Sequence, residues 1–338
     1  MTFDLNEETT LAEYLVYWLV NYSNATIRNS TYDTYSDIIY RHVIPNIGDI
    51  PLCELSLSDL QEFFNEQREH GNLRNNGELS AKTLDNYKKM LSKALEKAID
   101  LEYIDRNPIR RVELTRALPP QMAVLTREEE KLMLDHCFDE EFVEFGFAAF
   151  LADKFGMRNG EICALRWSDF DLRNMTVRVA HTACRIKNRE SNSDKQTIIR
   201  IGDTKTQNSR RVLPFTEKTG KIILNEMNRR RRSGYYESHN ASRDMRDYIF
   251  VSKTGGYSDT GTINDNFKRM LKALGIDNDE YHFHTLRHTF ATRAAERHVN
   301  EKVISYLLGH ANVQITLDRY THVLPDTARN DMKLIQDD

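Results

Sequence analysis

The chain has 338 residues, of which 40% are hydrophobic and 9% aromatic, so it is long and apolar enough for two folded domains and is not a disordered protein. It contains no run of about 18 apolar residues and no signal-peptide pattern, which argues against a membrane protein or a secreted one and predicts a cytoplasmic location. The formal net charge of −4 excludes a generic polycation that coats DNA, and the four cysteines lack metal-ligand spacing, so neither a disulfide nor a metal site is expected.

The first 112 residues are predicted to form a helical bundle, because apolar side chains recur there at helical spacing. The expected helices cover residues 11–22, 29–39, 58–71 and 80–99. Ser58 and Ser80 are suited to cap the last two, whereas residues 45–51, with two prolines and a glycine, are predicted to interrupt the pattern. This part has no group of nucleophilic side chains, and periodicity alone leaves its purpose open.

Residues 113–124 are predicted to form a linker to a second domain, residues 125–338. Pro119 and Pro120 stiffen this stretch, because each proline disfavours a helical conformation in the residue before it. The stretch that leads into the linker and the linker's first residues are basic, as suits a segment that follows a phosphate backbone, with Arg106, Arg110, Arg111 and Arg116.

A charged pair follows an apolar helix near the start of the second domain. Residues 142–155 are predicted to form that helix, and Gly156 to end it. Asn159 is suited to cap the next short helix, beside which Arg158 and Glu161 lie three positions apart and can face the same side. An exposed ion pair of this kind is ordinarily worth little, so the spacing alone allows both a site and a simple surface pair.

Three stretches in which β-branched residues alternate with others predict a small antiparallel sheet. They cover residues 175–186, 197–201 and 211–215. Together with the helices, this sheet predicts a mainly α fold of the α+β class. Lys205 lies between the last two strands, where a turn lysine is ordinarily part of the solvated surface.

Positive charge is concentrated around these strands. Residues 175–232 contain 15 Lys and Arg residues against five Asp and Glu residues, although the whole chain is negative. Such a stretch is most often a solvated face, but it also suits a surface that faces DNA. The arginine run 229–232 ends a helix expected to begin near Thr216, where it either contacts DNA or stabilises the helix C-terminus.

The C-terminal part combines two imidazoles and a guanidinium near predicted helix ends. Arg287 offers a planar fork of donors that matches two phosphate oxygens, and His284 lies three residues before it, near the start of a helix. A further helix is expected from an Asn300 cap to Gly309, which leaves His310 just beyond its end.

A third short helix, capped by Asn312, is predicted to end at Tyr320 and to direct its hydroxyl at whatever the preceding helices bind. A lone tyrosine or histidine is most often a packing residue. Here the order and spacing of three fragments matter: His-x-x-Arg-His at 284–288, Leu-Gly-His at 308–310 and Arg-Tyr at 319–320. They resemble the signature of the tyrosine recombinases, also called the phage integrase family.

The resemblance extends upstream and covers about residues 8–335. Gly-Met-Arg-Asn-Gly-Glu at 156–161 is similar to the family's first arginine box, and Lys205 falls where the family carries Lys-Thr followed by Ser-Arg. The polar segment 187–196 is longer than a tight turn needs and resembles hairpins of integrases from mobile elements of Gram-positive bacteria, such as phages and conjugative transposons.

The family resemblance implies a helical core-type DNA-binding domain followed by a catalytic domain. It implies that a tyrosine attacks the scissile phosphate, that arginines and a histidine bind the phosphate oxygens, and that a lysine protonates the departing 5′ oxygen, without ATP, metal or another cofactor. The implied catalytic residues are Arg158, Glu161, Lys205, His284, Arg287, His310 and Tyr320.

The implied product is a 3′-phosphotyrosine, which allows strand exchange through a Holliday junction and hence integration or excision of a mobile element. The implied partners are double-stranded attachment-site DNA, a tetramer held by the tail at 326–336, and possible accessory DNA-bending or directionality proteins. The implied DNA contacts are Arg28, Lys82, Lys88, Arg106, Arg110, Arg111, Arg210 and Arg211. The sequence starts almost at the first core-binding helix, so either the natural protein is of the simpler kind without the arm-binding domain that many integrases carry, or that domain has been removed.

Two other functions fit part of the pattern. A type IB topoisomerase shares the chemistry and the tyrosine nucleophile, but the Leu-Gly-His fragment, the helical bundle and the tail argue against it. A DNA-binding regulator without catalysis is a hypothesis of another class, and the complete set of polar residues argues against it. Covalent trapping on nicked DNA distinguishes an enzyme from a binder.

Overall fold

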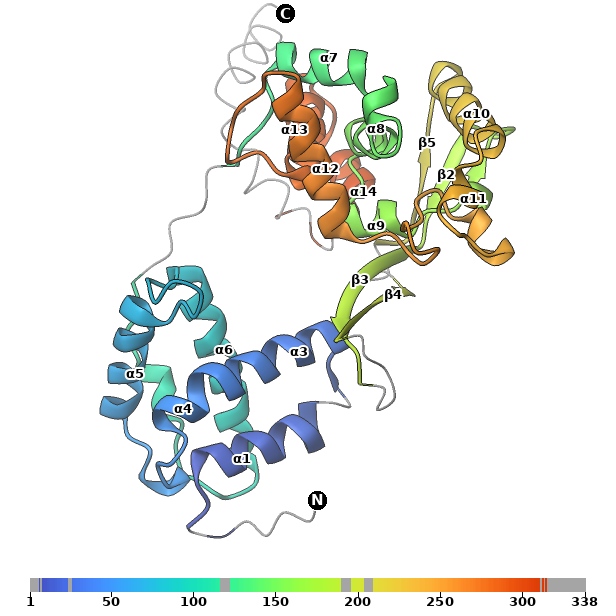
Figure 1. Ribbon diagram of the computed structural model, residues 1–338. Helices are drawn as coiled ribbons and strands as arrows, with labels where there is room; N and C mark the ends of the chain where they lie inside the picture. Colours follow the sequence, from blue (N-terminus) through green and yellow to red (C-terminus); the bar gives the residue numbers. More distant parts are fainter. Residues whose placement is uncertain are drawn as a thin grey trace, which may run out of the picture. The chain divides into compact units, whose positions relative to one another are not determined.

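Helices dominate the fold, and short strands form antiparallel pairs, so the predicted mainly α fold of the α+β class is confirmed (Figure 1). The computed structural model describes residues 6, 8–23, 26–115, 122–189, 196–203, 209–310, 312 and 314. The chain divides into two units, Met1–Pro120 with Arg189–Ser191 and Gln121–Asn188 with Asn192–Asp338. The main division, between Pro120 and Gln121, falls inside the stretch predicted as a linker.

The N-terminal unit is a helical bundle. Its elements are α1 (Leu11–Trp18), the π-helical turn η1 (Leu19–Ser23), α3 (Asn29–Ile38), the π-helical turn η2 (Ile39–Val43), α4 (Ile44–Ile47), α5 (Leu57–His70), α6 (Ala81–Asp100) and the 3₁₀ turns η3 (Leu52–Glu54) and η4 (Pro108–Arg111). Their apolar faces meet in a core that includes Trp18, Phe64 and Leu91. Ser80 caps α6 as predicted, since its hydroxyl accepts from the Thr83 N–H.

Two predicted details of the bundle are wrong. α5 is capped by Ser56 rather than Ser58, because Asp59 completes a capping box in which each side chain accepts from the other residue's N–H. The helical conformation also continues through Pro45 and stops only after Ile47. Pro45 lies in the first turn of α4, directly after the π-helical turn η2.

The C-terminal unit contains the remaining helices and the strands that the structure describes. Its α-helices are α7 (Arg127–His136), α8 (Gly146–Phe155), α9 (Asn159–Cys163), α10 (Glu217–Arg232), α11 (Tyr235–Ser238), α12 (Thr260–Ala273), α13 (Phe283–Glu296) and α14 (Glu301–Leu308). Its 3₁₀ turns are η5 (Glu140–Phe142), η6 (Trp167–Asp169) and η8 (Arg243–Asp247). Gly156 and Gly309 end α8 and α14 in the left-handed conformation, as predicted, with φ of 61° and 64°.

The described strands form two sheets instead of the single predicted sheet. They are β1 (Phe170–Asp171), β2 (Thr176–Val179), β3 (His181–Lys187), β4 (Thr197–Asp203) and β5 (Arg211–Pro214). β2 lies between β1 and β5, with Val177 opposite Leu213, whereas β3 pairs only with β4, with Ala183 opposite Ile201. The predicted strand 175–186 is therefore two strands, because its pairing partner changes after Val179.

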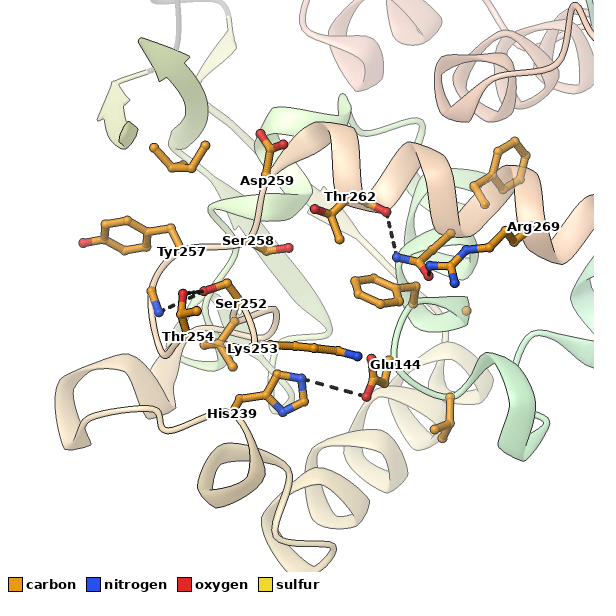
Figure 2. Close-up of a pocket in the computed structure, with 18 of the residues that line it drawn as sticks. Glu144, His239, Ser252, Lys253, Thr254, Tyr257, Ser258, Asp259, Thr262 and Arg269 are labelled. Atoms are coloured by element: carbon orange, nitrogen blue, oxygen red, sulfur yellow. Dashed lines mark hydrogen bonds and ion pairs between the residues drawn. The ribbon is translucent and has the colours of Figure 1, made fainter. Parts of the chain in front are cut away.

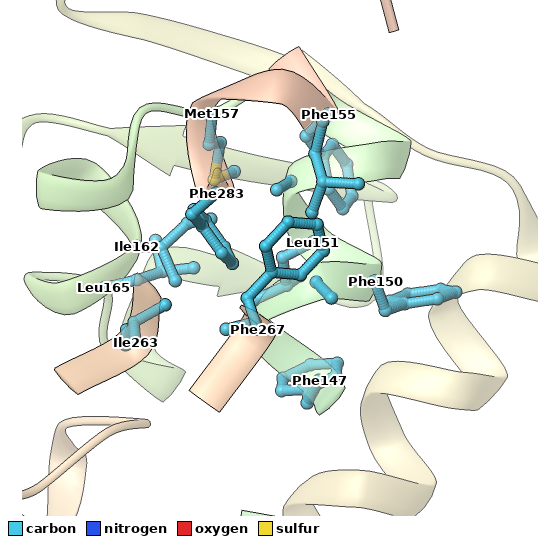
Figure 3. Close-up of a cluster of buried hydrophobic side chains, with 14 of the residues drawn as sticks. Phe147, Phe150, Leu151, Phe155, Met157, Ile162, Leu165, Ile263, Phe267 and Phe283 are labelled. Carbon is cyan, nitrogen blue, oxygen red and sulfur yellow. The ribbon is translucent and has the colours of Figure 1, made fainter. Parts of the chain in front are cut away.

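The core of this unit surrounds α8, nine of whose ten residues are buried. Figure 3 shows Leu151 and Phe155 of α8 among Ile162 of α9, Phe267 of α12 and Phe283 of α13. This packing fixes the short connection between α8 and α9, which carries Gly156 and Arg158, against α13.

Candidate active site

Glu161 is the buried centre of a cluster of charged side chains. It is only 2% exposed, on α9. Its Oε1 accepts from Nη1 of Arg158 (2.8 Å) and Nη1 of Arg211 (3.0 Å), and its Oε2 accepts from the N–H of Arg158 (2.9 Å) and Nη2 of Arg211 (2.9 Å). Burial alone would raise the pKa of this carboxyl, but the two arginines hold the pKa below its usual range, so Glu161 stays charged.

The position of Arg211 corrects the prediction that this residue contacts DNA. Its side chain has no exposed surface. Besides Glu161, the guanidinium donates from Nε to the Leu307 carbonyl (2.7 Å) and from Nη1 to the Ser209 carbonyl (3.1 Å). The sequence contained a signal: Arg211 lies two residues before the buried Leu213, and alternate residues of a strand share a face.

Three arginines from separate elements bind the C-terminal end of α14. The consecutive carbonyls of residues 307–309 accept hydrogen bonds from Arg211 (2.7 Å), Arg287 (2.7 Å) and Arg158 (2.9 Å), in that order. A helix C-terminus suits guanidinium groups, because its last carbonyls lack intrahelical partners and carry partial negative charge. Arg158 and Arg287 donate to neighbouring carbonyls, so the structure brings these two predicted site residues together.

The two predicted phosphate-binding arginines differ in exposure. Arg287 is 2% exposed and donates through its other terminal nitrogen, Nη1, to the Gly156 carbonyl (2.7 Å). The side chain of Arg158 is 36% exposed. Arg158 is also the N-cap residue of α9, which corrects the prediction for Asn159; the Asn159 amide donates instead to the Thr260 carbonyl.

His310 follows the left-handed turn at the end of α14. Its residue is 8% exposed, and its backbone N–H donates to the Ser305 carbonyl (3.0 Å). The turn at Gly309 packs closely against Arg211, since a Cβ atom at Gly309 would lie 3.0 Å from Nη1 of Arg211. The cap predicted at Asn300 is confirmed, so both ends of the helix that positions His310 were predictable.

His284 lies in the first turn of α13, one turn before Arg287, so both face the same side of the helix. The N-cap residue is His282, whose N–H and Nδ1 both lie within hydrogen-bond distance of the Thr285 hydroxyl. The His284 ring is perpendicular to that of His288, with centroids 4.7 Å apart. His284 and Arg287, two members of the predicted histidine–arginine fragment, thus share one face of α13.

Lys205, Tyr320, Arg116 and the predicted tail at 326–336 lie outside the described residues. Ser209, the first described residue after the segment that contains Lys205, is buried and accepts from Arg211.

The described part of the cluster carries surplus positive charge. Arg158, Arg211 and Arg287 stand against the single carboxylate of Glu161. Charges in a partly buried setting interact more strongly than they do in water, so this surplus attracts an anion. Two guanidinium groups with a histidine beside them suit the oxygens of a phosphodiester.

Two arginines of the run at the end of α10, Arg229 and Arg230, have a structural role. Arg230 is fully buried, binds Glu226 (2.6 Å) and donates to the carbonyls of Ile249 and Glu144, both at 2.9 Å. Arg229 also binds Glu226 (2.6 Å). Burial would raise the pKa of Glu226, but these arginines hold it below its usual range. Arg230 is therefore not a DNA contact.

The remaining predicted DNA contacts differ in how far they are engaged inside the protein. Arg28, Arg106 and Arg111 are exposed. Lys82 pairs with Asp85 (3.0 Å), Arg110 with Glu96 (2.6 Å) and Arg210 with Asp203 (2.6 Å), and Lys88 donates to the Val112 carbonyl (2.5 Å). The hydrogen bond from Arg110 lowers the pKa of Glu96.

A cavity of about 920 Å³ lies elsewhere in the C-terminal unit (Figure 2). Figure 2 shows His239 and Glu144 facing each other there, with 3.9 Å between Nε2 and Oε1. None of the described residues predicted for the chemistry lines this cavity. Across the described ranges no group of His, Cys, Asp and Glu side chains has the arrangement of a metal site. No described helix has the length and apolar character needed to cross a membrane.

Two protein-family models match the chain. The model of the phage integrase family matches residues 123–326, and the model of the phage integrase N-terminal SAM-like domain matches residues 10–67. The first of these matches spans the whole arginine cluster and the position of Tyr320.

Individual proteins give the same result. The chain is 25% identical to a tyrosine recombinase XerC-like protein of Caldanaerobacter subterraneus subsp. tengcongensis, over 98% of this chain and 84% of that protein. It is 25% identical to the transposase of transposon Tn916 from Enterococcus faecalis, over 85% of this chain and 68% of the transposase. The fold is similar to that of the Tn1549 transposon integrase, solved in complex with a circular intermediate DNA, with a TM-score of 0.78, 22% identity and coverage of 97% and 99%.

Proposed function

This chain belongs to the phage integrase family and is a site-specific tyrosine recombinase of the mobile-element type, and we propose that Tyr320 is the nucleophile with which it cuts and rejoins DNA. The observation that carries this proposal is the arginine cluster at the end of α14. Arg158 and Arg287 donate to neighbouring carbonyls there, and His310 follows within the same turn. His310, one of the proposed phosphate-binding residues, precedes Tyr320 by ten residues in the sequence.

The proposed chemistry is an in-line exchange at phosphorus. The Tyr320 oxygen attacks the scissile phosphate, its proton passes toward His284, and the bond to the 5′ oxygen breaks as Lys205 protonates that oxygen. A phenol with an ordinary pKa of about 10 is a poor nucleophile, so neighbouring cations are needed to stabilise the charge that develops. Arg158, Arg287 and His310 donate to the non-bridging oxygens, where preorganised donors have their largest effect.

Glu161 has a supporting role in this proposal. Two of its four hydrogen bonds come from the guanidinium and the backbone N–H of Arg158 and hold that residue in one orientation, and the other two come from Arg211. The product is a 3′-phosphotyrosine, which conserves the energy of the phosphodiester, so a 5′ hydroxyl of another strand reverses the attack without ATP.

The proposed partners follow from the reaction. Exchange between two double-stranded attachment sites passes through a Holliday junction and requires four protomers, one for each strand cut. The apolar positions of residues 326–336 suit contact with a neighbouring protomer. Integration or excision of an element would take place on chromosomal DNA in the cytoplasm, with accessory DNA-bending or directionality proteins as further partners.

Covalent capture tests the proposal. The protein is incubated with random-sequence and candidate attachment-site duplexes. The candidate sites carry a nick just 3′ of the expected cleavage position, so that the short fragment with the released 5′ hydroxyl diffuses away. A denaturing gel should show a protein–DNA adduct, and sequencing of the captured DNA should show one recurring site. Tyr320→Phe should bind DNA equally well and give no adduct, because only the nucleophilic oxygen is lost.

Tyr306→Phe is the matched control. Tyr306 is an exposed tyrosine of the same unit, and its hydroxyl donates to the Val212 carbonyl (3.1 Å). This variant should retain the adduct. An adduct with Tyr320→Phe, or its loss with Tyr306→Phe alone, would show that the nucleophile has been misassigned. Joining of two different duplexes by the wild type, rather than relaxation of supercoils alone, distinguishes a recombinase from a topoisomerase.

A further inference from the structure

The Arg211 guanidinium binds both the Glu161 carboxylate and the Leu307 carbonyl, and we infer that it is a positioning residue for cleavage: it leaves Arg158 available to the scissile phosphate and fixes the end of α14 that precedes His310. This inference rests on the proposed function, because it takes Arg158 and His310 as phosphate-binding groups.

The first part of the argument concerns charge. Glu161 is 2% exposed, and its two oxygens accept two hydrogen bonds each, one from Arg158 and one from Arg211. With both arginines present, the trio has a net positive charge. Without Arg211, Glu161 and Arg158 form a neutral pair, and a buried carboxylate that has lost two donors binds the remaining guanidinium more tightly. Arg158 then has less charge and less freedom to bind a phosphate.

The second part concerns the backbone of α14. Nε of Arg211 donates to the Leu307 carbonyl (2.7 Å), three residues before His310. The guanidinium also packs on the left-handed turn at Gly309, where an added Cβ would lie 3.0 Å from Nη1 and 3.3 Å from Cδ of Arg211. The position of His310 therefore depends on a side chain that itself has no exposed surface.

An arginine is required for this double role. Its guanidinium donates to both oxygens of Glu161, to Ser209 and to Leu307 from one rigid plane. A lysine has a single ammonium at one point and cannot reach all of these acceptors in fixed geometry.

Single-turnover cleavage of the nicked duplex, at saturating protein, separates this role from DNA contact. For Arg211→Met the cleavage rate should fall about 10- to 100-fold, less than the loss of a direct phosphate donor. The DNA dissociation constant, and the slope of log affinity against log salt, should match the wild type. An arginine on a DNA phosphate would instead lower that slope by about 0.9 when removed. Arg173→Met, which removes an exposed arginine of the same unit, is the control and should cleave at the wild-type rate.

A second substitution separates positioning from a general loss of structure. Adding Glu161→Gln to Arg211→Met removes the carboxylate that neutralises Arg158, so the double variant should cleave at least about threefold faster than Arg211→Met alone. Further slowing in the double variant would overturn the charge argument. Arg211→Lys keeps the charge and should fold even where Arg211→Met does not. It should still cleave about 10-fold more slowly than wild type, because the fork that holds Leu307 is gone.

The outcomes distinguish the inference from the proposed function. If the wild type forms the Tyr320-dependent adduct and Arg211→Lys cleaves at the wild-type rate, Arg211 is only structural and this inference is wrong. A salt slope that falls in the Arg211 variants would return Arg211 to the DNA surface. If the wild type forms no adduct at all, the proposed nucleophile fails first.

Discussion

Replacing Arg287 by lysine should affect both stability and cleavage, because this side chain is buried and holds two carbonyls. Arg287 is 2% exposed, and its terminal nitrogens donate to Gly156 and Leu308 at 2.7 Å each. A lysine ammonium can satisfy one of these carbonyls in place. The other loses a hydrogen bond to a charged donor inside the core, which lowers the free energy of unfolding by about 1.5–3 kcal/mol.

That destabilisation is measurable but does not unfold the protein. For a unit of this size it corresponds to a fall in Tm of roughly 3–12 °C. A domain with an ordinary stability of about 5–15 kcal/mol stays folded at assay temperature after such a loss. A fall in cleavage of about 10²- to 10³-fold, expected when one preorganised donor to the phosphate is lost, therefore cannot come from an unfolded fraction.

Arg158→Lys provides the comparison. The Arg158 side chain is 36% exposed, so its replacement should cost less stability while cleavage falls by a similar factor. Both variants are assayed by single-turnover cleavage of nicked duplex and by thermal unfolding followed by circular dichroism. If Arg287→Lys lowers Tm and leaves the cleavage rate unchanged, Arg287 acts only as a packing residue and its proposed role at the phosphate is refuted.

The remaining predictions concern the acid, the DNA surface and pH. Lys205→Ala should lose cleavage of ordinary DNA and regain it when sulfur replaces the 5′ oxygen, because a thiolate leaves without a proton; absence of rescue would assign the acid elsewhere. Arg111→Glu should lower the slope of log affinity against log salt by about 0.9 or more, measured by fluorescence anisotropy, and Arg110→Glu by less, since Glu96 already neutralises Arg110. Burial raises the pKa of Asp153 to about 6, so the folded state binds this proton more tightly than the unfolded state, and the folded protein gains stability as pH falls from about 7 toward 4. The Asp153→Asn variant should therefore have a higher free energy of unfolding than the wild type at pH 7, by up to about 3 kcal/mol when measured by urea unfolding. This difference should shrink at pH 5, and equal differences at both pH values would contradict the prediction.

The parts of the site that depend on local sequence were predictable. An asparagine cap at residue 300, a glycine at residue 309 and apolar spacing between them determine α14 without reference to the rest of the chain. Gly156 ends α8 for the same local reason, since a left-handed residue is needed there and only glycine adopts it without strain. The spacing of Arg158 and Glu161 likewise predicted a pair on one side of a short helix.

The parts that depend on contacts between distant segments were not predictable from local patterns. Arg211 and Arg230 are among the positively charged residues that suggested a DNA surface, yet both are buried. Their partners are distant in the sequence: Arg211 binds Glu161, 50 residues away, and Arg230 donates to the carbonyls of Ile249 and Glu144. The division of the predicted strand 175–186 has the same origin, since β2 and β3 pair with different strands. Within the described residues, charge density therefore overestimates the surface offered to DNA.

The end of α14 shows why such long-range contacts matter for catalysis. A helix C-terminus carries partial negative charge, which by itself would repel a phosphate. Arg158, Arg211 and Arg287 reverse that potential by binding the consecutive carbonyls of residues 307–309. Because two of these side chains are almost fully buried and held by backbone oxygens and Glu161, they need little rearrangement when charge develops on a bound phosphate, which is the condition under which electrostatic stabilisation is largest. The carbonyls that would oppose the reaction are thus the groups that hold its cations in place.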